Sequence, residues 1–291
     1  MPLPDPVFPG KAGLYLSMMH YGLFHNRDFA REHHAFFEKM TSYLGGFESR
    51  RVLDVGCGKS FWLTLLLANH GAKVTGIDTE VVKPGFSKDK YLELAKKNGY
   101  ERATRTFIWD QVFAKSYYKE LENLNKTPLD FEKVDLKAMS GVDLDFPDNT
   151  FDIVVSHEVF EHIADVSSTL KGLQRVMKPQ GKTYIYIHNF TSLSGGHHIA
   201  WKYPDAEPSR KVPPWDHLRE NKYSDIPSWL NRLREHEYRT EFEKYFEIID
   251  WLPTDREGET LLTDRIAKEL SDYSEDELLT KGFTVVAVPK K

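Results

Sequence analysis

The sequence lacks the features of a secreted or membrane-spanning protein. Cys57 is its only cysteine, so no disulfide can form within the chain, which fits a reducing compartment. No apolar run reaches the ~20 residues that a membrane-spanning helix needs. The first residues, MPLPDPVFPGKAG, are rich in proline and contain no apolar core of the kind that a signal peptide has. We therefore expect a cytoplasmic protein with no membrane association.

The sequence also lacks an excess of basic residues. Its 39 lysines and arginines are outnumbered by 44 aspartates and glutamates, which gives a net charge of −5. A protein that binds nucleic acid usually carries a basic face, so this balance favours a small-molecule substrate over a nucleic acid. Hydrophobic content of 40% and charged content of 29% over 291 residues are ordinary for a globular protein. The composition gives no indication of the oligomeric state.

The chain is organised around the stretch VLDVGCGKS, which begins at Val52. It is typical of a buried strand that stops at a glycine turn and leads into a helix, here over 61–70. A second short strand over 73–78 ends in Asp78. This order belongs to the nucleotide-binding half of a doubly wound sheet, which binds its ligand at the carboxyl ends of the strands. We expect Asp78 to accept hydrogen bonds from both hydroxyls of a ribose.

A third glycine is missing from this turn. Dinucleotide-binding enzymes place one where this chain has Phe61, so the pattern departs from their fingerprint. Asp54 lies inside the otherwise apolar first strand, and a buried carboxylate needs partners. Two interpretations of Asp54 stay open. It ties down the glycine loop, or it helps to hold a cationic ligand such as a sulfonium or an amino group.

Five further apolar runs complete a predicted seven-stranded sheet. They lie at 131–136, 151–156, 183–187, 246–251 and 283–288. Helical patterns separate most of these strands from one another. The order predicts an α/β fold with a doubly wound sheet that carries helices on both faces.

Three segments fall outside this predicted core. Residues 1–44 are expected to form an N-terminal helical arm with two helices, the second capped by Asp28. The remainder, 45–291, is expected to be one domain that carries an inserted rim segment at 81–130, with helices in its middle and at its end. A third segment, 190–228, is too long for an idle loop in a compact domain, and such loops are usually functional. Because it contains Gly195-Gly196 and several tryptophans, we expect a substrate lid.

Four motifs in order resemble class I S-adenosylmethionine-dependent methyltransferases of the small-molecule, methyltransferase type 11-like kind. They are VLDVGCG, TGID, FPDNTFDIVVSHEVFEH and RVMKPQGKTYIYI, and the resemblance covers roughly residues 45–190. It implies a mostly parallel sheet with an antiparallel last strand, and S-adenosylmethionine as cofactor. The cofactor-binding positions that it implies are Asp54, Gly56, Cys57, Gly58, Asp78, Ser140, Gly141 and His157.

The resemblance departs from the family at the adenine position. Relatives often carry an acid shortly before the segment that corresponds to Leu144–Asp148, whereas this chain has Ser140-Gly141 near that place. Ser140 can still accept a hydrogen bond from the adenine amino group. The departure puts the adenine contact in doubt and leaves the cofactor assignment intact.

The segment HEVFEH offers a possible metal site. If it is helical, Glu158, Glu161 and His162 share one face, and two carboxylates with an imidazole can bind magnesium, manganese or zinc. The same order of residues resembles metal-dependent O-methyltransferases that act on small-RNA 3′ ends and on catechol precursors of ubiquinone. Those enzymes add a later histidine, for which this chain offers His188, His197 and His198. The alternative is that these residues only support the loop.

Without a metal, methyl transfer to a hydroxyl benefits from a base. His157 and His188, at the ends of the fourth and fifth predicted strands, are the candidates. We expect O-methylation of a small cyclic, sugar-like or aromatic molecule. Methylation of an RNA or of an amine stays open, as do a nucleotide-dependent oxidoreductase and a non-catalytic cofactor-binding protein.

Overall fold

The computed structural model describes residues 10–81, 85–202, 204, 208–222 and 229–291. The remaining positions of the predicted arm, rim segment and lid lie outside the described residues. These positions are 1–9, 82–84, 203, 205–207 and 223–228.

Seven strands form one sheet in the order β3-β2-β1-β4-β5-β7-β6. β2 pairs in parallel with β1 and β3, whereas β7 pairs antiparallel with β5 and β6. The predicted α/β fold, mostly parallel with an antiparallel last strand, is therefore confirmed. The strands are β1 (Arg51–Val55), β2 (Lys73–Asp78), β3 (Asp135–Ala138), β4 (Phe151–His157), β5 (Met177–His188), β6 (Phe246–Pro253) and β7 (Gly282–Pro289).

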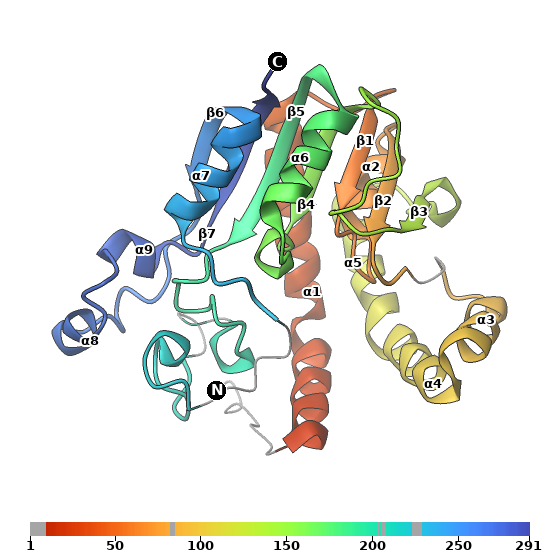
Figure 1. The fold of residues 1–291 in the computed structure, drawn as a ribbon. Helices are drawn as coiled ribbons and strands as arrows, with labels where there is room; N and C mark the ends of the chain where they lie inside the picture. The colour runs from red at the N-terminus through yellow and green to blue at the C-terminus, as the bar shows by residue number, and fades with distance from the viewer. Residues whose placement is uncertain (1–9, 82–84, 203, 205–207, 223–228) are drawn as a thin grey trace. The chain divides into compact units, whose positions relative to one another are not determined.

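The helices are coloured in chain order in Figure 1. None of those described is long and apolar enough to cross a membrane. They are α1 (Gly10–Leu44), α2 (Trp62–Asn69), α3 (Lys88–Asn98), α4 (Tyr100–Trp109), α5 (Lys115–Asn125), α6 (Val166–Val176), α7 (Glu235–Tyr245), α8 (Asp264–Glu269) and α9 (Glu275–Leu279). Short turns complete them: the π-helical η1 (Asp110–Ala114) and the 3-10 turns η2 (Phe131–Lys133), η3 (Phe160–His162), η4 (Ile199–Trp201) and η5 (Asp216–Leu218).

Residue contacts divide the chain into two compact units. The N-terminal unit comprises Met18–Gly141 and Phe151–Ile153. The C-terminal unit comprises Met1–Ser17, Val142–Thr150 and Val154–Lys291. The predicted division at residues 44 and 45 stays a prediction, and the two units are described separately below.

The core of the N-terminal unit is built around β1 and α2. Val52, Leu53 and Val55 of β1 are buried, as their β-branched and apolar side chains predict. α2 is buried along nearly its whole length, which explains why its sequence is apolar on every side. Gly76 in β2 leaves room for this helix, because a Cβ there would lie 2.5 Å from Thr64 Oγ1.

The expected pair of N-terminal helices is wrong, because α1 runs unbroken to Leu44. Asp28 does not cap a new helix. Its carboxylate instead contacts Arg31 Nη1 at 3.2 Å and His25 Nδ1 at 3.3 Å, both within one helical turn. No proline interrupts Gly10–Leu44, so nothing stops the helix before Gly45, which has a φ of 76°.

The rim segment packs on the glycine turn through aromatic rings. The cluster consists of the rings of Phe61, Phe86, Tyr118 and Phe131. Five pairs of these rings have centroid distances of 5.1–6.3 Å. The Tyr118 hydroxyl also donates a hydrogen bond of 2.7 Å to the Ser60 carbonyl. Helix α5 of the insertion is thereby attached to the loop that follows β1.

The C-terminal unit is closed by the β5–β7 and β6–β7 pairs. In Figure 1 the blue strand β7 lies between β5 and β6, as the strand order requires. Gly282 begins β7 opposite His188, and a Cβ at this glycine would lie 2.6 Å from the Ile187 carbonyl oxygen. The start of β7 therefore lies directly against the end of β5.

The first part of the predicted lid is packed inside the C-terminal unit. Leu193, Trp201 and Trp215 belong to one buried apolar cluster, together with side chains from α8 and α9. Gly195 and Gly196 are close-packed: a Cβ on Gly195 would lie 2.2 Å from the Asn189 carbonyl oxygen, and one on Gly196 would lie 2.6 Å from the His217 ring. These glycines are explained by packing. A lid function of 190–228 stays a prediction.

Candidate active site

The glycine turn of the N-terminal unit has the backbone conformation that its sequence predicts. Gly56 and Gly58 have φ values of 75° and 64°, in the left-handed region that favours glycine. The amides of Gly56 and Cys57 donate to the Ile77 carbonyl at 2.8 and 3.0 Å. These bonds fix the turn beside the carboxyl end of β2, which carries Asp78.

Asp78 already accepts two backbone hydrogen bonds. Its Oδ2 accepts from the Gly58 amide at 3.0 Å, and its Oδ1 accepts from the Glu80 amide at 3.0 Å. A carboxylate has about four lone-pair positions, so both oxygens keep capacity for ribose hydroxyls. The carboxylate therefore holds the glycine turn, and its contact with a ribose stays a prediction.

Asp54 is buried, with 1% of its surface exposed. Thr64 Oγ1 donates to Asp54 Oδ2 at 2.6 Å, so the carboxylate ties α2 to β1. Burial raises the pKa of Asp54 to about 7, in spite of the hydrogen bond from Thr64 that favours the charged form. The structure thus shows Asp54 attaching α2 to β1, and its roles toward the glycine loop and toward a cationic ligand both stay predictions.

Two residues in and just after the glycine turn, Cys57 and Phe61, have buried side chains. Cys57 is buried, and this burial raises the pKa of its thiol above the ordinary range, which suits packing rather than nucleophilic chemistry. Phe61, the residue immediately before α2, has a φ of 34°, an uncommon value for a residue with a bulky side chain. The position at which the dinucleotide fingerprint has glycine therefore keeps a left-handed backbone but carries a buried ring.

Ser140 and Gly141 follow the end of β3. In the β2–β3 register Asp78 lies opposite Ala138, and the Met139 amide donates to the Asp78 carbonyl at 2.9 Å. The sequence-predicted cofactor residues of the N-terminal unit are thus grouped at the carboxyl ends of β1, β2 and β3. Their contact with a cofactor is a prediction.

In the C-terminal unit, the helix that the predicted metal trio of Glu158, Glu161 and His162 requires does not form over HEVFEH. Glu158 leaves β4 with a left-handed φ of 54°, and only the short turn η3 follows. Three residues with one turn of 3-10 geometry cannot align Glu158, Glu161 and His162 on one helix face. His162 Nδ1 instead bonds to the Trp229 carbonyl at 2.9 Å.

The structure groups a different set of possible metal ligands. One donor atom each from Glu161, His188 and His197 lies within 4.8 Å of the others. The His188 and His197 rings are 4.9 Å apart, and Glu158 Oε1 lies 3.9 Å from His188 Nδ1. Of the predicted trio, only Glu161 belongs to this group, while His188 and His197 come from the set of later histidines.

Glu161 is the buried carboxylate of this group. It is 2% exposed, and neither of its carboxylate oxygens makes a hydrogen bond of normal geometry with a described residue. His197 Nε2, 4.0 Å from Glu161 Oε1, is likewise buried without a hydrogen bond to the described residues. Burial and the nearby charge of Glu158 raise the pKa of Glu161 well above its ordinary value. Such buried groups call for a further partner.

The two predicted bases are held neutral. Burial lowers the pKa of His157 to about 4 and holds the pKa of His188 well below its usual range. The His157 ring lies 5.0 Å from the ring of Tyr186. A neutral imidazole at physiological pH has an unprotonated nitrogen, which a base or a metal ligand requires.

His188 has a polar connection that no local sequence pattern predicts. Its Nε2 lies 2.8 Å from Ser194 Oγ, which in turn lies 2.7 and 3.0 Å from the two carboxylate oxygens of Glu257. The Ser194 amide donates to the same carboxylate at 2.7 Å. Glu257 is 63 residues from Ser194 in an acidic loop, so only the folded chain brings the three together.

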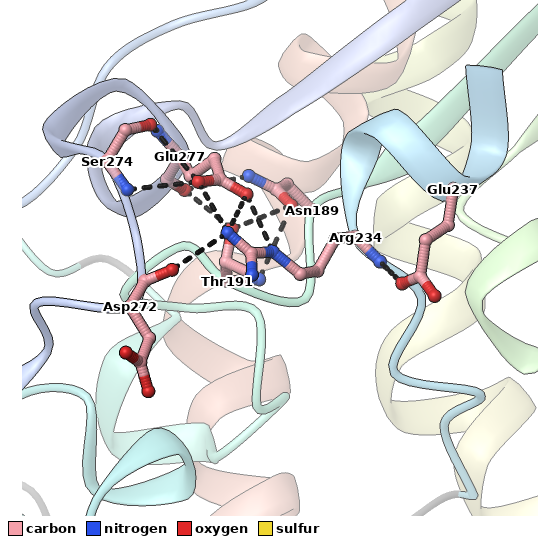
Figure 2. Close-up of polar contacts among 7 residues, drawn as sticks. All are labelled: Asn189, Thr191, Arg234, Glu237, Asp272, Ser274 and Glu277. Atoms are coloured by element: carbon pink, nitrogen blue, oxygen red, sulfur yellow. Dashed lines mark hydrogen bonds and ion pairs between the residues drawn. The ribbon is translucent and has the colours of Figure 1, made fainter. Parts of the chain in front are cut away.

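The turn after β5 is fixed by a second network, shown in Figure 2. Asn189 donates to the carbonyls of Glu277 and Thr280, and the Thr191 hydroxyl donates to the Glu277 carbonyl at 2.6 Å. Arg234 donates to the Glu277 carboxylate at 2.8 Å and to the Asp272 carbonyl at 3.0 Å. The bonds from Asn189 and Thr191 attach the segment that carries Ser194 and His197 to α9 and to Thr280 at its C-terminal end.

A profile of a methyltransferase domain family matches residues 22–248. The chain belongs to this family. The match includes the glycine turn, Asp78, the HEVFEH segment and the group around His188. It therefore covers the predicted residues of both units, and confirms the family that the sequence motifs indicated.

Similar proteins include two further methyltransferase types. The ubiquinone biosynthesis O-methyltransferase of Aeromonas salmonicida is 25% identical over 150 residues, which are 52% of this chain and 48% of that protein. The sterol 24-C-methyltransferase erg6 of Aspergillus fumigatus is 33% identical over 149 residues, 50% of this chain and 30% of that protein. The chain thus spans about half the length, or less, of these relatives.

Solved structures of similar proteins share little sequence with this chain. PH0226 of Pyrococcus horikoshii is 18% identical, with a TM-score of 0.46 and coverage of 87% of each chain. A Mesorhizobium loti S-adenosylmethionine-dependent methyltransferase is 15% identical, with a TM-score of 0.47 and coverage of 84% of this chain and 93% of that one.

Proposed function

We propose that this protein transfers a methyl group from S-adenosylmethionine to a small-molecule acceptor. The observation that carries the proposal is the methyltransferase family match over residues 22–248. S-adenosylmethionine supplies an electrophilic methyl group on a positively charged sulfur. The intact glycine turn and Asp78 argue against a non-catalytic relative, and Phe61 in place of a third glycine argues against a nucleotide-dependent oxidoreductase.

The residues of the N-terminal unit fit the cofactor. Gly56 and Gly58, which have left-handed backbone conformations in the turn, carry no side chain. A Cβ at Gly58 would meet no described atom within 4 Å. A ligand can therefore approach the backbone closely there. Asp78 has acceptor capacity for ribose hydroxyls. Ser140 follows β3, the strand next to the one that ends in Asp78, and we assign it to the adenine amino group.

We infer that the acceptor atom is a hydroxyl oxygen of a small cyclic, sugar-like or aromatic molecule. A hydroxyl has a pKa far above 7, so transfer of a methyl group to its oxygen benefits from a base that removes the proton. Burial keeps the imidazoles of His157 and His188 unprotonated, so each has a ring nitrogen that can accept the hydroxyl proton, and the same burial makes each a weaker base than a free histidine. The similarity to ubiquinone biosynthesis O-methyltransferases supports this choice. RNA and amine acceptors are the alternatives, and the net charge of −5 weighs against RNA.

We further infer a divalent cation at Glu161, His188 and His197. The residues present fit such an ion: one carboxylate and two neutral imidazoles converge, and the buried atoms of Glu161 and His197 make no other hydrogen bond with described residues. When bound, magnesium, manganese or zinc would act as a Lewis acid that lowers the pKa of an acceptor hydroxyl. Glu158 and His162 lie next to this group.

A mass-based turnover assay tests the activity. The protein is incubated with S-adenosylmethionine and a library of cyclic, sugar-like and aromatic alcohols, and the products are searched for a gain of one methylene unit. Calorimetry with S-adenosylmethionine and with its demethylated product is run in parallel. Tight binding of a nicotinamide dinucleotide in place of both would overturn the proposal.

The same assay separates the base from the metal. If the metal acts, a chelator abolishes turnover and magnesium, manganese or zinc restores it. If a base acts alone, the chelator has no effect, while His157→Ala or His188→Ala slows turnover by ~100-fold or more. Activity that survives the chelator and both substitutions would point to an amine acceptor, which needs only proximity.

A further inference from the structure

We infer that Ser194 and Glu257 are positioning residues that fix the tautomer of His188. The inference rests on the proposed function only in giving His188 a chemical task. Its structural basis is the chain of hydrogen bonds from Glu257 through Ser194 to His188, which is entirely buried and lies within the C-terminal unit.

The tautomer follows from counting protons along this chain. Burial raises the pKa of Glu257, and the hydrogen bonds from the Ser194 amide and hydroxyl oppose this rise by favouring the charged carboxylate. An ionised carboxylate only accepts hydrogen bonds, so with Glu257 ionised the Ser194 hydroxyl must donate its single proton to Glu257. Ser194 Oγ then offers only a lone pair to His188 Nε2, at 2.8 Å. Nε2 must therefore carry the proton, and the neutral ring has its lone pair on Nδ1.

Nδ1 is the ring nitrogen on the side of Glu158. It lies 3.9 Å from Glu158 Oε1, on the side of the ring opposite the Ser194 contact. The fixed tautomer gives this nitrogen the lone pair that a base or a metal ligand needs. A hydrogen bond to the other ring nitrogen is the usual way in which proteins orient such a histidine.

The geometry of Glu257 suits this role. Its carboxylate accepts both the amide and the hydroxyl of Ser194, so the serine side chain is fixed at two points. Gly258 follows with a φ of 75° and approaches Leu193, where a Cβ would lie 2.7 Å from Leu193 Cδ2. The loop after β6 is thereby packed directly on the segment that carries Ser194.

The order of the three groups excludes a nucleophilic serine. In hydrolase triads the histidine lies between the serine and the acid and withdraws the serine proton. Here the serine lies between Glu257 and His188, and its proton is directed to the carboxylate. Ser194 is also buried, with 4% of its surface exposed, so a substrate carbonyl cannot reach it in this structure.

The experiment is nitrogen-15 NMR of the histidine rings in the intact protein, with His188 assigned by its loss in His188→Asn. We expect wild-type His188 to be the Nε2-protonated tautomer. Glu257→Gln presents an amide that can donate to Ser194 Oγ, which would turn the serine proton toward His188. We expect this variant to shift His188 toward the Nδ1-protonated tautomer.

Two variants control the measurement. Ser194→Ala removes the bond to Nε2, so we expect His188 to become a mixture of tautomers. Asp110→Asn removes another buried carboxylate, one that pairs with Lys90 in the N-terminal unit, and is expected to leave the His188 signals unchanged.

An Nδ1-protonated His188 in the wild type would overturn the inference, even if the variants fail to fold. A tautomer that is the same in wild type and in folded Glu257→Gln would also overturn it. The measurement uses neither substrate nor turnover. The positioning role of Ser194 and Glu257 can therefore be disproved while the methyl-transfer proposal holds. In the same way, methyl transfer can be disproved while the positioning role holds.

Discussion

His197 Nε2 lies 4.0 Å from Glu161 Oε1, and both atoms are buried without a hydrogen bond of normal geometry to any described residue. Folding has therefore removed two polar groups from water and left them facing one another across a gap. Such an arrangement costs stability in the isolated chain, since each unsatisfied group loses about 1–3 kcal/mol of solvation. The cost becomes understandable if the gap accepts a ligand.

The first prediction concerns this cost. In chelator-treated protein, Glu161→Met is expected to raise the free energy of unfolding by ~1–3 kcal/mol, because an apolar side chain of similar size replaces two unsatisfied oxygens. Urea titration measures the change. Glu257→Met is the matched control: it also replaces a buried glutamate, but one that accepts hydrogen bonds from Ser194, and it is expected to destabilise the protein. Zinc is expected to raise the melting temperature of the wild type alone, and equal shifts in wild type and Glu161→Met would contradict the metal site.

The second prediction concerns pH and Asp54. Its pKa is raised from 3.8 to about 7 in the folded state, so between these values the folded protein holds a proton that the unfolded chain has released. The free energy of unfolding therefore falls as the pH rises through this window. About three pKa units at 1.36 kcal/mol each give a loss on the order of 4 kcal/mol.

Asp54→Asn isolates this contribution. The asparagine does not titrate, and its carbonyl oxygen can still accept from Thr64. The stability of the variant relative to the wild type is thus expected to increase from pH 4 to pH 8, measured by urea unfolding at each pH. A difference that does not change with pH would show that Asp54 is ionised throughout.

The third prediction concerns the ribose contact. Asp78→Asn keeps one carbonyl oxygen but loses the charge and one acceptor, so S-adenosylmethionine binding is expected to weaken by ~1.5–3 kcal/mol in calorimetry. Asp78→Ala also removes the acceptors of the Gly58 and Glu80 amides, and is expected to lower the melting temperature as well. Glu80→Gln, which removes a neighbouring exposed charge, serves as the control with near-normal affinity. Wild-type affinity in Asp78→Asn would show that Asp78 does not contact the ribose.

The fourth prediction concerns the segment that we expected to act as a lid. The amides of Ser192, Ser194 and Gly195 donate to Asn189, Glu257 and Ser192, respectively, in a buried environment. Hydrogen exchange at these amides is therefore expected to be slow both with and without S-adenosylmethionine. Protection that appears only on ligand binding would instead support closure of this part of the segment.

The strand–turn–strand unit around Asp78 could be predicted because its signals are local. Apolar strand residues, two glycines and a terminal acid lie within one stretch of sequence, and each specifies its own backbone conformation. The start of α2 was harder to predict. A phenylalanine with a φ of 34° follows no propensity, and only the absence of the third glycine marked Phe61 as unusual.

The polar group around His188 could be predicted only in part. The histidines and glutamates could be named from the sequence as candidate ligands. The grouping of Glu158, Glu161 and His162 required a helix, whereas Glu158 adopts a left-handed conformation. This backbone conformation changes which of the side chains that follow Glu158 can come together in one group. The partnership of Ser194 with Glu257 depends on how the loop after β6 packs, which no local pattern encodes.

The absence of a side chain at Gly195 has a consequence for comparative genomics. A Cβ there would lie 2.2 Å from one backbone oxygen and 2.5 Å from another, so no substitution fits unless the turn itself is rebuilt. Any homologue with a larger residue at this position must therefore present His197 differently. A glycine at this alignment column would then serve as an inexpensive marker for sorting genomes into those that share this arrangement and those in which it was lost.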